Sequence, residues 1–381
     1  MDKNVKVIIG ANYGDEGKGL LTRFFVKQAE QPVVIFHNGT AQRGHTVDYN
    51  PKFRHVYHHF GCGTADGAPT FFAKTFWVHP MEFYREWHEL AAQGIRPVCY
   101  CDPDALVVTP FDMLIDHISK AYITWEHQEP QHGSCGFGTW CATDRYPNAI
   151  FTVKDYLNSL TRETLLKKAW DSCVAQLLIR GVDLDKVPQY QEFFEPKTAE
   201  QRKKITITNF NKDLDFFFSK VQLKTFDEVY EEYKDIIFEN AQGLGLDKNC
   251  GKEWHTTSNT GILNPFEMLS GKEDFNAEVC YVSRSYMTRH GIGYMENETC
   301  KREINEDMFD KTNVPNEFQG TLRYGYPEDK EMIKRVENDF KVVSKNIHFT
   351  KSLAITHCNE FPNFNEDAAY ISNNPYSVLK R

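Results

Sequence analysis

Apolar residues along the chain fall into two alternating patterns. Short continuous runs have the length of buried strands, and longer stretches carry apolar residues at helical spacing. This alternation predicts an α/β fold in which a mostly parallel central sheet is flanked by helices. The expected strands are Val5–Ile9, Pro32–Phe36 and Leu353–Thr356, and the expected helices are Leu20–Gln28, Met81–Gln93 and Phe111–Ile123.

The organisation of the chain predicts a single large domain over residues 1–381. With 381 residues, of which 41% are hydrophobic, the chain can bury a sizeable core. The sequence contains no internal repeat, low-complexity tract or clear linker. Residues 150–235 carry no motif that points to chemistry, and the polar stretch Glu195–Lys204 is expected to be a solvated excursion.

The segment Gly10–Gly19 joins the first expected strand to the first expected helix and contains four glycines. Such a loop lets backbone amides approach a ligand at a helix N-terminus, where anions are stabilised. The same loop carries one carboxylate, Asp15, and one ammonium, Lys18. A phosphate loop with a potential base and a phosphate-binding lysine indicates chemistry on a nucleotide.

Two common phosphate loops do not fit this segment. A Walker A loop needs a glycine where Asn12 stands and a hydroxyl residue where Gly19 follows the lysine. The Rossmann spacing G-x-G-x-x-G is also absent from this segment. From the residues alone, a glycine-rich turn without a ligand remains an alternative, and Asp15 could be a helix N-cap.

Composition narrows the possible partners and location. A net charge of −9 argues against broad electrostatic binding of nucleic acid. No apolar run approaches the roughly 20 residues that span a bilayer, and the N-terminus does not read as a signal peptide. We therefore expect a cytoplasmic protein with no membrane or nucleic-acid partner. The scattered cysteines are expected to be reduced, and a metal site on Cys135 and Cys141 would need ligands that the sequence does not identify.

Six short motifs together resemble the adenylosuccinate synthetase family. Each motif is weak alone, but all six occur in the family's order over most of the chain. The matching segments are Gly14–Gly19, Gly44–Thr46, Glu239–Gly243, Thr256–Thr260, Met287–Gly293 and Ile371–Pro375. The resemblance implies the family's α/β fold, a homodimer, Mg²⁺ as cofactor and small-molecule substrates.

The resemblance also implies a two-step reaction at purine C6. A nucleoside triphosphate phosphorylates the 6-oxygen of a purine monophosphate, and the amine of L-aspartate then displaces the phosphate. By resemblance, Asp15 removes the proton from purine N1 and His45 steadies the transferring phosphoryl group. A histidine at position 45 could equally be a buried core residue. The resemblance further assigns Mg²⁺ to Asp15 and to the carbonyl of Gly44.

The remaining site residues follow by matching positions to the family motifs, and one of them, Arg145, is expected to reach the site of a second subunit. The residues expected to bind the triphosphate are Asn12, Gly14, Glu16, Gly17, Lys18, Gly19, Thr46, Asn359, Ser372 and Pro375. Those expected to bind the purine monophosphate are Asp15, Gln42, Arg43, Ser134, Cys135, Arg145, Asn240, Gln242 and Thr257. Those expected to bind aspartate are Thr288, Gly320, Thr321 and Arg323.

Departures from the family pattern point to a different purine. Asn359 replaces the aspartate that reads guanine, which favours ATP or dATP over GTP. Gln42 and Asn240 add hydrogen-bonding groups where the resemblance places the purine, and only Arg323 survives of the family's arginine run. These changes resemble the bacteriophage branch, which converts dGMP to 2-amino-2′-deoxy-N6-succinyladenylate for 2-aminoadenine DNA.

Alternatives remain at this stage. The first is the family's usual reaction with IMP, L-aspartate and GTP. A phosphate-loop GTPase or kinase would turn over without aspartate, and an inactive nucleotide sensor would bind nucleotide without turnover. Whether the sugar must be deoxy depends on packing near His290 and Thr321, which the sequence does not show.

Overall fold

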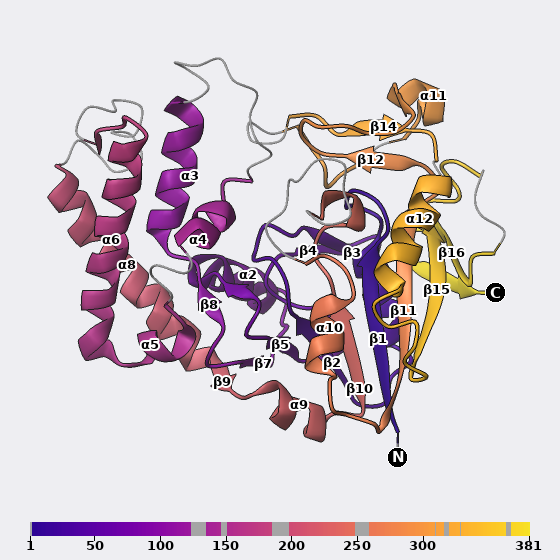
Figure 1. Ribbon diagram of the computed structural model, residues 1–381, viewed down its shortest axis with the longest axis horizontal. Helices are drawn as coiled ribbons and strands as arrows, with labels where there is room; N and C mark the ends of the chain where they lie inside the picture. The colour runs from indigo at the N-terminus through magenta and orange to yellow at the C-terminus, as the bar shows by residue number, and fades with distance from the viewer. Residues whose placement is uncertain are drawn as a thin grey trace.

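A ten-stranded sheet runs through the computed structural model (Figure 1), in the order β17-β16-β15-β11-β1-β10-β2-β5-β7-β9. Every neighbouring pair is parallel except β16–β17, where the C-terminal edge strand is antiparallel. The mostly parallel sheet predicted from the apolar pattern is therefore confirmed. The structure describes residues 2–122, 135–145, 151–184, 198–247, 259–308, 310–315, 320–327, 329–362 and 367–381.

The central strands explain how the site is assembled. Strand β1 lies between β10 and β11 and is buried over its second half, because its apolar residues face helices on both sides. The loops that follow β1, β2, β10, β11 and β15 therefore meet at one edge of the sheet. The sheet strands are β1 Lys3–Gly10, β2 Pro32–Phe36, β5 Thr70–Phe72, β7 Cys99–Cys101, β9 Val221–Leu223, β10 Asp235–Glu239, β11 Phe275–Arg284, β15 Phe349–Thr356, β16 Tyr370–Asn374 and β17 Ser377–Lys380.

Smaller sheets surround that edge. Strands β3 and β4 form a hairpin that begins with His45 and Thr46 of the Gly44–Thr46 motif. Strands β12, β14 and β13 form a three-stranded antiparallel sheet. A further parallel pair, β6 and β8, lies beside the main sheet. The bounds of these strands are β3 His45–Asn50, β4 Phe53–Tyr57, β6 Trp77–Val78, β8 Leu106–Val107, β12 Met287–Arg289, β13 Glu298–Thr299 and β14 Arg323–Gly325.

The three expected helices are confirmed within a few residues. Helix α1 begins at Lys18, directly after Gly17, whose φ of 91° is a left-handed conformation that suits glycine. Helix α2 has proline at its first position and is capped by His79, whose side chain accepts the Glu82 amide. The helices are α1 Lys18–Val26, α2 Pro80–Ala92, α3 Pro110–Tyr122, α4 Thr139–Arg145, α5 Val153–Leu157, α6 Ser159–Ile179, α8 Ala199–Lys220, α9 Phe226–Glu232, α10 Leu263–Met268, α11 Lys301–Asn305 and α12 Asp329–Phe340.

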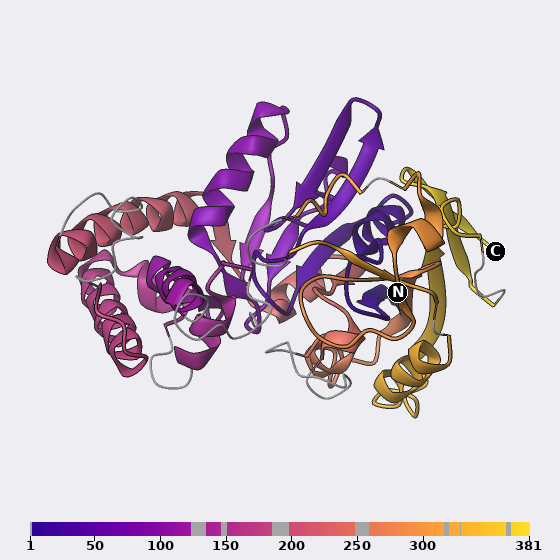
Figure 2. The same cartoon turned by 90° about the horizontal axis from the view of Figure 1, so that it is seen from above.

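Helices α3, α4, α5, α6 and α8 form a lobe at one end of the molecule, opposite the C-terminal strands (Figures 1 and 2). The expectation of a solvated excursion is wrong for residues 199–204, which form the start of the 22-residue helix α8. Thr198 and Gln201 form a capping box there, which satisfies the first amides of the helix. Residues 195–197 lie outside the described part.

One apolar cluster joins the lobe to the sheet. It includes Ile8 and Val34 from the central strands together with Trp170 and Phe217 from the lobe helices. The lobe therefore shares its core with the sheet, although the single-domain boundary at residues 1–381 stays a prediction.

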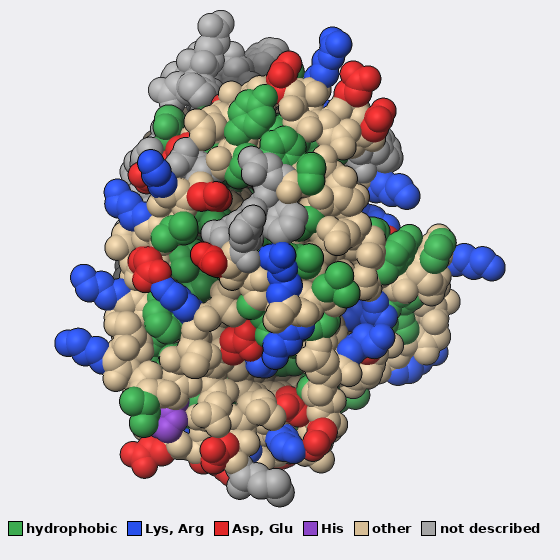
Figure 3. All heavy atoms as spheres, turned by 90° about the vertical axis from the view of Figure 1, so that its right-hand side faces the viewer, with side chains coloured by type: hydrophobic (Ala, Val, Ile, Leu, Met, Phe, Trp, Pro, Cys, Tyr) green, Lys and Arg blue, Asp and Glu red, His purple; other side chains and the backbone are tan. Residues whose placement is uncertain are grey.

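The surface mixes both signs of charge. On the face shown in Figure 3, basic and acidic side chains are interspersed. Among the described helices, none has the length and apolarity to cross a membrane. The described cysteines are free thiols, and most of them are buried.

Candidate active site

An open cavity of about 840 Å³ lies at the carboxyl edge of the central strands. Its walls come from the loops after β1, β2, β10, β11 and β15, as the parallel topology requires. Most of the expected site residues meet there. Those lining the cavity are Gly14, Asp15, Glu16, Gly17, Lys18, Gly19, Gln42, Arg43, Gly44, His45, Thr46, Cys135, Gln242, Asn359, Ser372 and Pro375.

Glu16 holds the glycine loop in shape. One carboxylate oxygen accepts the amides of Gly14 at 2.7 Å and Asn12 at 3.2 Å, and the other accepts from Lys18 Nζ at 2.7 Å. A Cβ at Gly10 would lie 2.5 Å from this carboxylate, which explains the glycine there. The Glu16 side chain is thus committed to the protein, although the sequence suggested that it binds nucleotide.

Lys18 lies in the cavity wall with its charge already compensated. Its side chain is 2% exposed and pairs with Glu16. A buried ammonium without a partner would be strongly disfavoured, and Glu16 supplies that partner beside the loop amides. An arriving phosphate would gain a cation that is held in place before binding.

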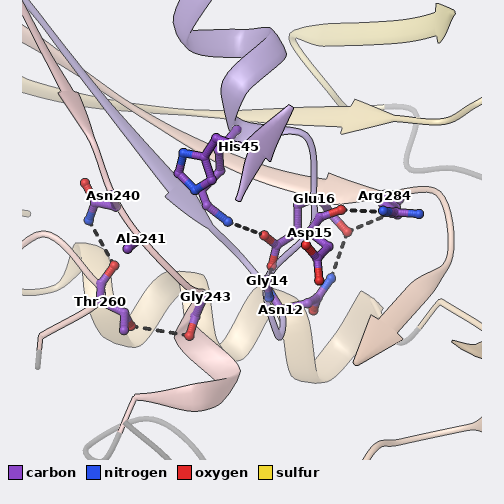
Figure 4. Close-up of polar contacts among 12 residues, drawn as sticks. Asn12, Gly14, Asp15, Glu16, His45, Asn240, Ala241, Gly243, Thr260 and Arg284 are labelled. Atoms are coloured by element: carbon purple, nitrogen blue, oxygen red, sulfur yellow. Dashed lines mark hydrogen bonds and ion pairs between the residues drawn. The ribbon is translucent and has the colours of Figure 1, made fainter. Parts of the chain in front are cut away.

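Asp15 has an unusual backbone conformation and two anchors. Its φ is 60°, and Arg284 donates from Nε to its carbonyl at 2.5 Å (Figure 4). Its carboxylate Oδ2 lies 3.3 Å from His290 Nε2. Since the residue before α1 is Gly17, and no side chain caps that helix, the alternative in which Asp15 is an N-cap is wrong.

His45 is buried and oriented by Glu239. Its Nδ1 lies 2.5 Å from a Glu239 carboxylate oxygen, which also accepts from Cys62 Sγ at 2.9 Å. Glu239 further accepts the Cys62 amide at 3.0 Å. This contact leaves His45 Nε2 as the ring nitrogen for the cavity that the residue lines.

The electrostatics of this buried cluster favour a neutral ring beside a carboxylate. Burial disfavours the imidazolium and lowers the pKa of His45. Burial also opposes a charged Glu239, but hydrogen bonds from His45 and Cys62 outweigh it and hold the pKa of Glu239 below its ordinary value. Among the described residues, these three form the one group with the spacing of a metal site. Because burial keeps the Cys62 thiol protonated by raising its pKa, we interpret the group as a hydrogen-bonded cluster.

Three expected ligand-binding residues instead support the loops from within. Asn12 is buried, donates to Ser283 and accepts from Arg335. The Arg43 guanidinium donates to the carbonyls of Glu239 and Asn38 and lies over the Phe36 ring, although other atoms of Arg43 line the cavity.

Asn240 is the third of these internal residues. Its amide donates to the Thr260 carbonyl (Figure 4). The same amide donates to the Gly261 carbonyl, and the side-chain oxygen meets His37 Nε2. Because all three side chains have internal partners and Asn240 is completely buried, the structure gives Asn240 no direct route to a purine in the cavity.

The expected phosphate and aspartate residues are not assembled as the sequence suggested. Arg145 is buried in α4, where it pairs with Asp112 and donates to the Val107 carbonyl, so it does not reach outward toward a second subunit. Arg323 pairs with Glu298 and donates to the carbonyls of Gly291 and Gly293.

The other residues expected to bind aspartate do not line the cavity, and two residues expected to bind the purine monophosphate cannot be placed. Thr288 is buried in β12, and Gly320 and Thr321 are exposed, all outside the cavity wall. Ser134 and Thr257 lie outside the described residues.

Sequence reasoning missed several cavity residues. Arg284 ends the buried strand β11, and its guanidinium contacts Asp15, Tyr286 and Asp310. A cation at the carboxyl end of a buried strand is a signal that could have been used. His290 was noted only for sugar packing, yet it contacts Asp15.

Two side-chain amides in the cavity wall, Gln42 and Gln242, have polar atoms that could meet a ligand. Gln242 has a φ of 64°, and its buried side-chain oxygen has no hydrogen-bond partner among the described residues. The Gln42 side-chain oxygen accepts the Thr40 amide at 2.7 Å, which leaves the side-chain nitrogen of Gln42 to donate to a ligand. Together they offer an acceptor and a donor to a ligand.

Replacing Glu239 by glutamine is expected to lower turnover by about 10²-fold or more, because a neutral amide cannot stabilise a charged His45 ring. Steady-state turnover at saturating substrates measures the effect, and thermal denaturation verifies folding. The exposed Glu89→Gln on α2 is the matched control. Turnover of folded Glu239→Gln within fivefold of the unmodified protein would remove this role.

A family model and two similar sequences carry the same description. A family model described as adenylosuccinate synthetase matches residues 7–323. The adenylosuccinate synthetase of Halothermothrix orenii is 27% identical over 317 residues, covering 80% of this chain and 67% of the relative. That of Clostridium botulinum is 24% identical over 306 residues, covering 77% and 65%. The chain thus matches about two thirds of the length of these relatives.

Two solved structures share the fold. A fully ligated adenylosuccinate synthetase from Plasmodium falciparum superposes with a TM-score of 0.71 at 18% identity, covering 94% of this chain and 77% of that one. A cyanophage S-2L succinoaminodeoxyadenylate synthetase, bound to dGMP and to dATP as an energy donor, gives 0.61 at 13% identity, covering 100% and 96%. At these sequence identities the two structures show that this chain shares their fold, and nothing more.

Proposed function

Because the chain belongs to the adenylosuccinate synthetase family, we propose that it is a ligase that joins L-aspartate to C6 of a purine nucleoside monophosphate. A nucleoside triphosphate supplies the energy. The observation that carries the proposal is the meeting of Asp15 and the His45–Glu239 pair in one cavity with the glycine loop. A carboxylate base, an oriented imidazole and a phosphate cradle are the groups that phosphorylation of a 6-oxopurine needs.

The first step makes an O–P bond at the purine. Asp15 takes the N1 proton, the 6-oxygen attacks the γ-phosphorus, and the bond to the β-phosphate oxygen breaks to release the nucleoside diphosphate. The amides of the glycine loop and Lys18 stabilise the phosphate charge. The strict positions of Asp15 and Lys18 in one rigid loop supply the orientation that this step requires.

His45 changes its protonation preference when the substrates arrive. In the cavity without substrates, burial favours the neutral ring. Phosphate groups beside Nε2 bring negative charge that favours an imidazolium, and Glu239 stabilises that cation from the Nδ1 side. His45 can then donate from Nε2 to the oxygen that bridges the purine and the phosphoryl group.

The second step exchanges oxygen for nitrogen at C6. The aspartate amine attacks C6, the C6–O bond breaks, and phosphate leaves with the former 6-oxygen. Recognition of aspartate by Thr288 and the segment 320–323 remains part of the proposal. Arg323 would have to exchange Glu298 for a substrate carboxylate.

Mg²⁺ fits the oxygen donors of the cavity. The Asp15 carboxylate and the Gly44 carbonyl both line it, and Mg²⁺ prefers such hard oxygen ligands together with phosphates. These two residues would hold the ion, which would neutralise charge on the transferring phosphate.

We favour dGMP as the purine substrate. The Gln242 oxygen has no hydrogen-bond partner among the described residues and can accept from a ligand. Because Asp15 takes the N1 proton, the donor left on that edge is the 2-amino group of guanine, which hypoxanthine lacks. The cyanophage relative of the same fold was solved with dGMP and dATP. The polar groups of Arg43 and Asn240 have partners inside the protein, so recognition of a 2-amino group would fall to Gln42 and Gln242. IMP with GTP, which the resemblance to the adenylosuccinate synthetases implies, is the second candidate.

Asn359 predicts the preferred triphosphate. It is exposed and lines the cavity, and the amide of the preceding Cys358 donates to the Ser372 carbonyl at 3.0 Å. Replacing it with aspartate is expected to lower the ratio of kcat/KM for ATP to kcat/KM for GTP by about tenfold, since a carboxylate accepts from guanine N1–H and the 2-amino group. The exposed Gln93→Glu at the end of α2 is the charge control. An unchanged ratio would contradict the assignment of Asn359 to the base.

A crossed turnover assay tests the proposal. Purified protein with Mg²⁺ and L-aspartate is given dGMP, GMP or IMP against ATP, dATP or GTP, and phosphate release and product mass are measured. We expect aspartate-dependent product from dGMP with ATP or dATP. Product from IMP alone would make the protein an IMP-using ligase. Phosphate release without aspartate would indicate a kinase or GTPase, and binding without turnover would indicate a sensor.

A further inference from the structure

A closed ring of polar contacts surrounds Asp15. Arg284 donates to the Asp15 carbonyl, and another of its nitrogens lies 3.2 Å from Asp310 Oδ2. That oxygen accepts from Asn313 Nδ2 at 2.7 Å. Asn313 Oδ1 lies 2.9 Å from His290 Nε2, which is 3.3 Å from Asp15 Oδ2. The ring thus connects the main chain of Asp15 to its own carboxylate.

The contacts assign the donor in each link. Asn313 uses its NH₂ group on Asp310, so its carbonyl oxygen faces His290. His290 Nε2 therefore has two acceptors beside it and must carry a hydrogen. The other ring nitrogen is buried and has no hydrogen-bond partner among the described residues. The orientation of the imidazole is consequently set by its contacts with Asn313 and Asp15.

The segment that supplies Asn313 is itself fixed in place. Asp310 accepts the amides of Thr312 and Asn313 at 2.9 and 3.0 Å, which closes a tight turn. The Thr312 hydroxyl bonds the Thr46 hydroxyl at 2.8 Å and also receives a hydrogen bond from Arg54. The turn is therefore attached to the β3–β4 hairpin on the opposite wall of the cavity.

Asp15 needs such support because its backbone is strained. A φ of 60° is uncommon for residues other than glycine and disfavours the folded loop unless its surroundings hold it. The preceding Gly14, with a φ of 98°, imposes little restraint of its own. Arg284 fixes the carbonyl, but that contact alone leaves the side-chain torsions of Asp15 free.

We propose that His290 is a positioning residue that holds the Asp15 carboxylate in its reactive orientation through the Asp310–Asn313 turn. This inference rests on the proposed function, in which Asp15 is the base. With Oδ2 in contact with His290, Oδ1 is the carboxylate oxygen left to take the purine N1 proton. His290 acts through Asp15 and does not itself take the substrate proton.

Paired substitutions test the role. His290→Leu removes the donor and is expected to lower kcat by about tenfold or more with the KM of the triphosphate unchanged within twofold. His290→Gln keeps an N–H donor and is expected to restore kcat to within threefold of the unmodified protein. His88→Leu, on the exposed face of α2, controls for loss of a histidine. Equal losses in the leucine and glutamine variants would overturn the proposal.

A double-mutant cycle separates this inference from the proposed function. If His290 acts through Asp15, His290→Leu adds less than a twofold loss when Asp15 is already asparagine. Independent, multiplying losses would overturn the positioning role while leaving Asp15 as the base. Retention of turnover by Asp15→Asn alone would instead contradict the proposed function.

Hydrogen exchange gives a readout that needs no turnover. In a peptide covering residues 11–20, His290→Leu is expected to speed amide exchange by about tenfold, whereas His290→Gln and His88→Leu leave it unchanged. Unchanged exchange in His290→Leu would show that the ring does not restrain the loop and would overturn the proposal.

Discussion

Asp15→Asn is expected to lower turnover by about 10²-fold or more while the protein still folds and binds nucleotide. Asparagine has nearly the same shape and tolerates the φ of 60° that residue 15 adopts, so the loop should keep its form. It cannot take a proton from purine N1, and general-base catalysis typically contributes about 10² to 10⁴ in rate. The measurement compares the turnover of Asp15→Asn with that of the unmodified protein at saturating substrates and Mg²⁺.

A second substitution separates the base from the backbone. Asp15→Ala should lose as much turnover and also some stability, because alanine is disfavoured at positive φ by about 1 kcal/mol. Asp104→Asn, at an exposed carboxylate paired with Lys154, is the matched control and should be neutral. If folded Asp15→Asn keeps turnover within fivefold of the unmodified protein, Asp15 is not the base.

Acidification from pH 8 to pH 5 is expected to destabilise the protein by several kcal/mol. Burial lowers the pKa of His37 and of His79 to about 4, and it lowers that of His59 well below the ordinary 6.5. Below pH 6.5 these three histidines therefore bind protons in the unfolded chain but stay neutral in the folded protein. Each ring with a folded pKa near 4 costs about 2 kcal/mol of stability at pH 5.

One variant isolates the contribution of His79 to this loss of stability. Asp339 works in the opposite direction, since burial raises its pKa to about 6, so the total mixes several groups. His79→Asn keeps a side chain that can accept the Glu82 amide at the start of α2 but cannot titrate. In urea denaturation at pH 8 and pH 5, the loss on acidification should be about 2 kcal/mol smaller in His79→Asn. An equal loss in both proteins would contradict the assignment of His79 as a buried neutral group.

Local patterns were enough to predict the sheet and the glycine loop. The run Val5–Ile9 and the helix after Lys18 are specified by short-range apolar spacing and by glycine, and both occur where expected. The parallel strands place the loops that carry Asp15, His45 and Gln242 at one edge of the sheet, although these residues lie far apart in the chain. Residues of several motifs therefore line one cavity, and their roles there stay a prediction.

The direction of individual side chains could not be predicted in the same way. Arg43 and Asn240 lie in the expected motifs, yet their polar groups satisfy buried carbonyls that only the folded structure creates. Arg145 was expected to reach out of the subunit, but its ion pair with Asp112 depends on the packing of α3 against α4. Such internal demands compete with ligand binding for the same residue types.

The helical lobe shows a second reason for failure. Its residues carry few motifs, and the apolar face of α6 is hard to recognise in the sequence. The buried stripe of this helix includes Arg162, whereas Leu160 and Ile179 are exposed. Polar residues 199–204 suggested solvent, whereas the capping box at Thr198 starts a helix there. Reading the capping box would have corrected that expectation.

The central claim, that a 6-phosphoryl purine precedes the carbon–nitrogen bond, is tested most directly by following the purine oxygen. The protein is incubated with Mg²⁺, L-aspartate, ATP and dGMP labelled with ¹⁸O at position 6, with labelled IMP in a parallel reaction. The mechanism predicts one ¹⁸O atom in each phosphate released and an aspartate adduct without label. Phosphate without ¹⁸O, formed while the labelled monophosphate stays intact, would contradict the account.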